Sequence, residues 1–299
     1  MKPEELKRQA EEKYQSLQFR DDYLFCKILV DKPDIAKDLL ELILGVKIKK
    51  VVPHTQKQIE IIADARGVRL DVYLEDENQT VYDLEMQTTK RTDLPKRSRY
   101  YQGMIDLDMM QRGAKFSELK KSYVIFICVD DPYREGRHIY SFENICIQNP
   151  ERKLGDESYK IFLNASGTMD DVSDSLLDFF DLILTGKGKT ALSKRIEEEV
   201  EKAKSHKEWR LEFMSIFMRD EEMRAEGRAE GREEGRAEGR EEGRAEGREE
   251  GRAEGREETK VKYLRLLIIN GETKERIIQN YGFTEEEYEK AKEAIFTTV

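Results

Sequence analysis

The chain has 299 residues, of which 38% are hydrophobic and 39% charged, and its formal net charge is −10. This composition predicts a folded core of ordinary size, and the acidic balance argues against a protein that coats nucleic acid with a basic surface. No apolar run approaches the roughly 20 residues that cross a bilayer, and the chain starts without an apolar targeting segment. We therefore expect a cytoplasmic protein that does not contact membranes. The wide spacing of Cys26, Cys128 and Cys146 predicts reduced core thiols and no zinc site.

The first predicted elements lie between residues 21 and 64. Residues 21–45 carry apolar side chains at a spacing of three to four and end in Gly45. Because Pro33 interrupts this pattern, we expect one broken helix or two packed helices. Segments 46–52 and 58–64 alternate apolar and polar residues, which predicts two strands.

Residues 67–87, "GVRLDVYLEDENQTVYDLEMQ", resemble two antiparallel strands joined by a turn centred on Asn78. In such a hairpin the numbers of paired residues have a constant sum, and a sum of 156 pairs Val72 with Leu84. A one-residue slip would mix acids into the apolar face, so the pattern favours this register or one shifted by two residues. The predicted apolar face holds Leu70, Val72, Leu74, Tyr82, Leu84 and Met86. The opposite face holds Arg69, Asp71, Tyr73, Asp83, Glu85 and Gln87.

The predicted register places Asp71 directly opposite Glu85. Two carboxylates about 4 Å apart repel each other by about 4 kcal/mol at an effective dielectric constant near 20. Like charges are normally avoided at paired positions of neighbouring strands. A divalent cation between the two carboxylates would remove the repulsion. A solvated sheet face would also carry acids, and the composition alone leaves both interpretations open.

The main domain continues with a helix and a strand. Residues 94–113 have the helical pattern and end in Gly113. Residues 122–129, "SYVIFICV", form a continuous apolar run, which is typical of a strand buried on both faces. The predicted order of helix, three strands, helix and strand indicates an α/β fold with a mixed sheet.

The composition changes near residue 190. We predict a main domain at 1–188, a charged helical linker at 189–224, a repeat at 225–256 and a small helical unit at 257–299. The repeat has eight copies of AEGR or EEGR. A helix formed by the repeat would lose about 6 to 8 kcal/mol through its glycines and would stack like charges four residues apart. Pairing with a second chain would compensate, which predicts a homo-oligomer, and a flexible spacer explains the composition equally well.

The tail from 261 to 295 is expected to form three short helices separated by Gly271 and Gly282. Thr284 begins the sequence TEEE, which predicts a capping box for the last helix. The last two helices are rich in acids, whereas a helix that reads DNA should be basic. We therefore expect a packing or oligomerisation unit here.

Several segments together resemble a known family. Asp71 is followed by thirteen residues and then by Glu85, Met86 and Gln87, which is similar to the D…(D/E)-x-K/Q pattern of the PD-(D/E)XK nuclease superfamily. The segments "RDDYLFCKIL", "RLDVYLEDENQTVYDLEMQ" and "RSRYYQGMIDLDMMQRGAKFSELKKSYVIFI", with the glycine-rich tail, resemble its recombination-promoting nuclease (Rpn) or transposase family. The similarity covers most of residues 20–165. It implies a restriction-endonuclease-like core of order αβββαβ, in which helices flank a mixed central sheet.

The resemblance implies a DNA endonuclease that depends on Mg²⁺ or Mn²⁺, uses no organic cofactor, and acts in recombination or mobile-element biology. Asp71 and Glu85 would bind the cation, which would activate a water molecule against the phosphodiester. Gln87 stands where many members of the superfamily carry lysine, and it could orient the water without adding a positive charge. Asp22 matches an early helical Asp-x-x-Phe of the family and is a candidate additional acid. The helix dipole also favours an acid at that position.

A basic segment follows the predicted catalytic strand. Its candidate DNA-binding residues are Lys90, Arg91, Lys96, Arg97, Arg99, Tyr101 and Gln102. Such residues would contact phosphates without reading sequence, and a solvated helix start with core tyrosines is the alternative. A non-catalytic nuclease-fold scaffold that assembles through the repeat is a second possible function. Metal binding at Asp71 and Glu85 would distinguish the two functions.

Overall fold

The computed structural model describes residues 3–54, 58–59, 68–110 and 115–296. The chain divides into two compact units, Met1–Arg219 and Asp220–Val299.

Within the described residues, six strands form the central sheet of the first unit, in the order β1-β4-β5-β6-β10-β7. Their bounds are Val51–His54 for β1, Val72–Asp76 for β4, Val81–Gln87 for β5, Ser122–Cys128 for β6, Ile139–Phe142 for β7 and Ser158–Asn164 for β10. Strands β5, β6 and β10 are parallel, and the other pairs are antiparallel. Two short antiparallel pairs join β2 (Gln58–Ile59) to β3 (Val68–Arg69) and β8 (Ile145–Cys146) to β9 (Asn149–Lys153).

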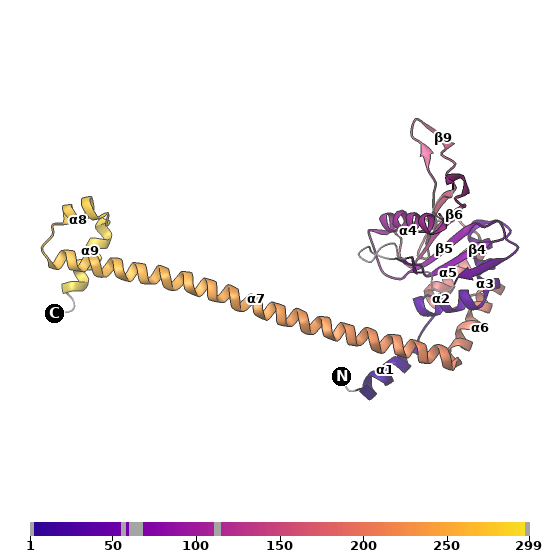
Figure 1. The fold of residues 1–299 in the computed structure, drawn as a ribbon, viewed down its shortest axis with the longest axis horizontal. Helices are drawn as coiled ribbons and strands as arrows, with labels where there is room; N and C mark the ends of the chain where they lie inside the picture. Colours follow the sequence, from indigo (N-terminus) through magenta and orange to yellow (C-terminus); the bar gives the residue numbers. More distant parts are fainter. Residues whose placement is uncertain (1–2, 55–57, 60–67, 111–114, 297–299) are drawn as a thin grey trace. The chain divides into compact units, whose positions relative to one another are not determined.

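Helices cover both faces of this sheet. The helices of this unit are α1 (Pro3–Gln15), α2 (Asp22–Asp31), α3 (Pro33–Leu44), α4 (Leu94–Met109), α5 (Asp174–Thr185) and α6 (Ala191–Ser205), with a short 3₁₀ turn at Phe116–Glu118. Helix α1 lies against the end of α6, where Tyr14 donates to the backbone oxygen of Ala203. One buried cluster joins α2, α3, α5 and α6 to one face, and a second cluster joins α4 to the other (Figure 1). The predicted restriction-endonuclease-like α/β core, with helices flanking a mixed sheet, is confirmed.

The N-terminal helical segment breaks where the sequence predicts. Helix α2 ends at Asp31, and Pro33 occupies the first turn of α3. Proline has no N–H to continue a helix and disfavours helical geometry at the residue before it. Gly45 ends α3 in the left-handed conformation, with φ of +66°.

The predicted hairpin register is confirmed. Val72 pairs with Leu84, and the pairing continues to Glu75 opposite Val81. Leu70 departs from the predicted apolar face and belongs to the cluster under α4. The reason is that β3 ends at Arg69 and the chain bends at Asp71 before β4 begins.

The two strands expected before the hairpin differ from the prediction. The first covers only Val51–His54, and residues 46–50 lie outside it. The backbone N–H groups of Lys49 and Lys50 donate to the Glu77 carboxylate, which replaces strand pairing there. Of the segment 58–64, residues 58–59 form β2, and 60–64 lie outside the described residues.

The helix and strand that follow the hairpin agree closely with the prediction. Helix α4 covers Leu94–Met109, while the expected stop at Gly113 lies outside the described residues. In β6 every side chain from Val124 to Cys128 is at most 2% exposed. The continuous apolar run is therefore a strand buried on both faces.

The first compact unit extends past the boundary expected at residue 188. Helix α6, predicted as part of a charged linker, contributes Ile196, Val200 and Ala203 to the core. Asp178 of α5 also accepts hydrogen bonds from the backbone N–H of Lys189 at 2.6 Å and of Thr190 at 2.9 Å. The segment after 188 is thus fixed to the domain, and the unit ends at Arg219.

The tail of the chain is helical. Helix α7 runs from Lys207 to Ile269 and includes the whole repeat, followed by α8 (Lys274–Tyr281) and α9 (Glu285–Phe296). A small core joins Leu264, Leu267, Ile277, Phe283, Tyr288 and Ala291. The predicted capping box is present, because Thr284 and Glu287 each accept a hydrogen bond from the other's backbone N–H. Among the described residues, no helix combines the length and apolar character needed to cross a membrane.

Candidate active site

Asp71 and Glu85 meet at the end of the β4–β5 hairpin. Asp71 precedes β4, and its Oδ2 accepts the backbone N–H of Met86 at 3.2 Å. The backbone N–H of Asp71 donates to Glu85 Oε1 at 3.0 Å. These two hydrogen bonds, from backbone N–H groups to carboxylate side chains, continue the strand pairing beyond Val72 and Leu84. They bring together Asp71 and Glu85, the two acids that the register places opposite each other.

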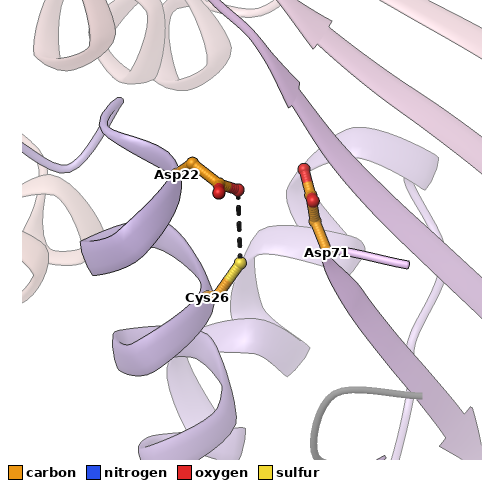
Figure 2. A group of neighbouring side chains, drawn as sticks. All are labelled: Asp22, Cys26 and Asp71. Carbon is orange, nitrogen blue, oxygen red and sulfur yellow. Dashed lines mark hydrogen bonds between the residues drawn. The ribbon is translucent and has the colours of Figure 1, made fainter. Parts of the chain in front are cut away.

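Helix α2 adds two side chains to this end of the hairpin. One ligand atom each from Asp22, Cys26 and Asp71 lies within 4.8 Å of the others (Figure 2). The Cys26 thiol donates to Asp22 Oδ1 at 3.6 Å, one helical turn away. Asp22, the candidate additional acid, thus lies beside Asp71. Cys26 is a free thiol that is only partly buried, and it packs at the edge of the main core.

Asp83 of β5 adds a second buried carboxyl group on the Glu85 face of the strand. Asp83 is 0% exposed and Glu85 is 1% exposed. Neither carboxyl oxygen of Asp83 has a hydrogen-bond partner within the described chain. The sequence pattern places Asp83 on the Glu85 face without indicating a role for it. Its signal was an acid two residues before Glu85 in a strand that is otherwise buried.

Burial and mutual repulsion raise the pKa of these acids. Burial raises the pKa of Asp71 to about 7, and the negative charge of Asp22 contributes further. The pKa values of Asp83 and Glu85 also lie well above their ordinary values, mainly because of burial and then because of neighbouring carboxylates. A cation would favour the ionised forms of all these groups.

Gln87 ends β5 and is held from two sides. Its Nε2 donates to the backbone oxygen of Thr89 at 2.7 Å and to the Thr89 hydroxyl at 2.9 Å. Its Oε1 accepts from Arg97 Nη1 at 2.9 Å, and Arg97 Nη2 donates to Glu85 Oε2 at 3.0 Å. Arg97 of α4 therefore joins the side chains of Glu85 and Gln87.

Three of the candidate DNA-binding residues point inward. Arg97 contacts Glu85, Tyr101 is 8% exposed, and Gln102 is 6% exposed. Gln102 donates to Ser122 at 2.7 Å and to Asp106 at 2.9 Å. These side chains belong to the interface between α4 and the sheet, so they do not form the exposed surface that the sequence suggests.

The remaining candidates lie at the surface. Lys90, Lys96 and Arg99 are exposed, and Arg91 forms an ion pair with Asp93 at 3.0 Å. An open cleft of about 820 Å³ lies at the carboxyl ends of β5 and β6. Its lining includes Gln87, Lys90, Arg91, Cys128, Asp130 and Arg134. Ligands commonly bind beyond the carboxyl ends of parallel strands.

The carboxyl groups of this site fit a hard divalent cation. Asp22, Asp71 and Glu85 would hold it, since Mg²⁺ and Mn²⁺ prefer carboxylate oxygens. The fit is supported by the proximity of Asp22 and Asp71, by the hydrogen bond from the Asp71 N–H to Glu85, and by the two unpartnered oxygens of buried Asp83. A cation is the group that would compensate such a concentration of negative charge.

One of three comparisons with known proteins found a match. A family model described as PD-(D/E)XK nuclease family transposase matches residues 19–166. This range runs from just before α2 to just after β10 and includes all the acids of the site. A comparison with curated proteins and one with solved structures each gave no significant match. Residues 19–166 belong to the PD-(D/E)XK nuclease family transposases, the family that the sequence resembles.

Proposed function

We propose that the protein is a DNA endonuclease that requires a divalent cation and acts in recombination or in the movement of mobile elements. The observation that carries the proposal is that Asp22 lies beside Asp71, and that Glu85 accepts the Asp71 backbone N–H, inside a domain of the nuclease family. These acids belong to separate elements, and only the fold brings them together.

Each residue of the site has a distinct part in the proposed hydrolysis. Mg²⁺ or Mn²⁺, when bound, would polarise the phosphodiester and lower the pKa of a bound water. Asp71 and Glu85 would bind the cation, with Asp22 as an additional acid, and the bond from the Asp71 N–H keeps Glu85 oriented. Gln87 borders the cleft and orients the attacking water, with its own amide fixed by Thr89 and Arg97.

The DNA backbone would lie along the exposed basic side chains near the cleft. Lys90 lines the cleft, and Lys96 and Arg99 are exposed on α4. Lysine and arginine at such positions contact phosphate oxygens and do not read base sequence. We expect strong salt dependence of DNA binding as a result.

The long helix supports a second part of the proposal, assembly of two or more copies. Every residue from 222 to 260 of α7 is exposed, including the eight glycines of the repeat. Glycine in a helix interior is unfavourable by about 0.8 to 1 kcal/mol relative to alanine. Glu and Arg rows of a second copy would supply compensating contacts. We also propose that the protein is cytoplasmic.

Plasmid cleavage tests the proposed function. Supercoiled plasmid is incubated with wild-type protein, Asp71→Ala or Glu75→Gln, in Mg²⁺, in Mn²⁺ and in EDTA. Glu75 lies on β4 outside the site and serves as the matched control. Wild type and Glu75→Gln should nick the plasmid only with a divalent ion, and Asp71→Ala should not. Equal cleavage by Asp71→Ala would contradict the assigned site, and an inactive wild type would favour the scaffold function.

A further inference from the structure

Arg97 was expected on the DNA-binding surface, but its side chain is directed into the site. We propose that Arg97 supplies the positive charge of the active site, orienting Glu85 and stabilising the charge that develops on the reacting phosphate. This inference rests on the proposed function and assigns a role to a residue outside the motif of two acids and a glutamine.

The guanidinium group is held in one position. Its Nε and Nη2 donate to the Tyr101 hydroxyl at 2.9 and 2.8 Å, while Nη1 and Nη2 reach Gln87 and Glu85. Its central carbon lies 5.1 Å from the centre of the Tyr101 ring and 5.4 Å from that of Phe126. Aromatic faces attract cations at such distances. The orientation is therefore fixed before any substrate binds.

The hydrogen-bond inventory leaves one donor for a substrate. A guanidinium has five N–H groups, and the four bonds of Arg97 use one on Nε, one on Nη1 and both on Nη2. The second N–H on Nη1 has no protein acceptor within the described chain. Nη1 is also the atom that contacts Gln87, and Gln87 lines the cleft. A phosphate oxygen in the cleft near Gln87 would be a suitable acceptor for this N–H.

The charge balance of the site gives Arg97 a second function. Asp71, Asp83 and Glu85 are close together, and in the described part of the chain Arg97 is the cation that hydrogen-bonds to one of them. A buried carboxylate needs a compensating charge, and Arg97 provides one for Glu85 at 3.0 Å. Gln87 is neutral, so it cannot stabilise the additional negative charge of the transition state as a cation would. Arginine keeps its proton throughout the accessible pH range and can do so.

A purely structural role is the competing explanation, because Arg97 also connects α4 to the sheet. The two roles differ in what a replacement cation should restore. A structural role requires the several hydrogen bonds that only the planar guanidinium group of arginine can make. An electrostatic role requires only a positive charge beside Glu85 and Gln87. The test therefore compares variants of different charge and includes a separate measurement of folding.

The experiment measures nicking by full-length protein in Mn²⁺ for wild type, Arg97→Lys, Arg97→Gln, Arg97→Ala and the control Arg152→Gln. Arg152 is exposed on β9, away from the cleft lining. We expect Arg97→Gln to lower kcat by about a hundredfold or more, with a smaller change in KM. Arg97→Lys should retain clearly more activity than Arg97→Gln. Millimolar guanidinium should restore activity to Arg97→Ala, whereas urea should not.

Thermal unfolding of each variant is measured first, so that the nicking assay is run at a temperature at which every variant is folded. Wild-type kcat in folded Arg97→Gln would overturn the inference. Equal loss in Arg97→Lys and Arg97→Gln, together with no effect of guanidinium on Arg97→Ala, would also overturn it. A wild-type protein that cleaves no DNA would instead contradict the proposed function, so the two failures are distinguishable.

Discussion

Asp71→Asn is expected to stabilise the metal-free protein above pH 7. Burial and the charge of Asp22 raise the pKa of Asp71 from its ordinary 3.8 to about 7, so the folded state favours the protonated carboxyl. Ionisation therefore destabilises the fold as pH rises from about 4 to about 7, and the full effect is present above pH 7. The pKa change corresponds to at most about 4 kcal/mol at pH 8 and about 2 kcal/mol at pH 5.

Asparagine removes this charge and keeps the local hydrogen bond. Its side-chain oxygen can still accept the Met86 N–H, and its amide group can donate to Asp22. Asp71→Ala also removes the repulsion but leaves the Met86 N–H without its acceptor, which costs about 1 to 3 kcal/mol. We therefore expect Asp71→Asn to be more stable than Asp71→Ala.

Urea unfolding in EDTA, followed by tryptophan fluorescence, measures the effect. Trp209, the single tryptophan, packs against the main core of the first unit and reports its unfolding. Asp71→Asn should exceed wild type in free energy of unfolding, with a larger difference at pH 8 than at pH 5. At a cation concentration roughly 100 times the Kd, wild type should gain about 2.7 kcal/mol and the variant little. A metal-free variant less stable than wild type at pH 8 would refute the reasoning.

Three further outcomes are expected. Calorimetry should show Mn²⁺ affinity rising about tenfold from pH 6 to pH 8, because Asp71 must lose its proton; a constant affinity would place the ion elsewhere. Cys26→Ser should leave Mg²⁺ binding unchanged but weaken Cd²⁺ binding and remove the thiolate–Cd²⁺ absorption, since thiolates prefer soft ions; unchanged Cd²⁺ spectra would exclude contact. A chain ending at Arg219 should fold, nick DNA and show a smaller mass by light scattering, whereas one ending at Thr190 should unfold, since it lacks α6. An unchanged mass would place the interface in the first unit.

Local signals were sufficient to predict much of the fold. The hairpin register follows from strict alternation, because a one-residue slip would move acids such as Asp83 into the apolar face. The break at Pro33 follows from the missing N–H of proline, and the buried β6 from a run of apolar residues. The opposition of Asp71 and Glu85 is a direct consequence of the register.

The remaining features depend on tertiary packing. The basic cluster in the sequence does not reveal that Arg97 faces the sheet while Arg99 faces solvent, because this depends on how α4 rotates against its neighbours. The proximity of Cys26 and Asp22 to Asp71 depends on the docking of α2. Helix α6 was assigned to the linker because its many charges obscure a narrow apolar face, although the core residues Ile196, Val200 and Ala203 follow helical spacing.

Locating the cation in a crystal tests the assigned metal site. A crystal soaked in Mn²⁺ would give an anomalous scattering peak at the position of the ion. The peak is expected to be coordinated by Asp71 together with Asp22 or Glu85, and to be absent from crystals of Asp71→Asn. A Mn²⁺ peak away from all three carboxylates, in a protein that still nicks DNA, would contradict the assigned site.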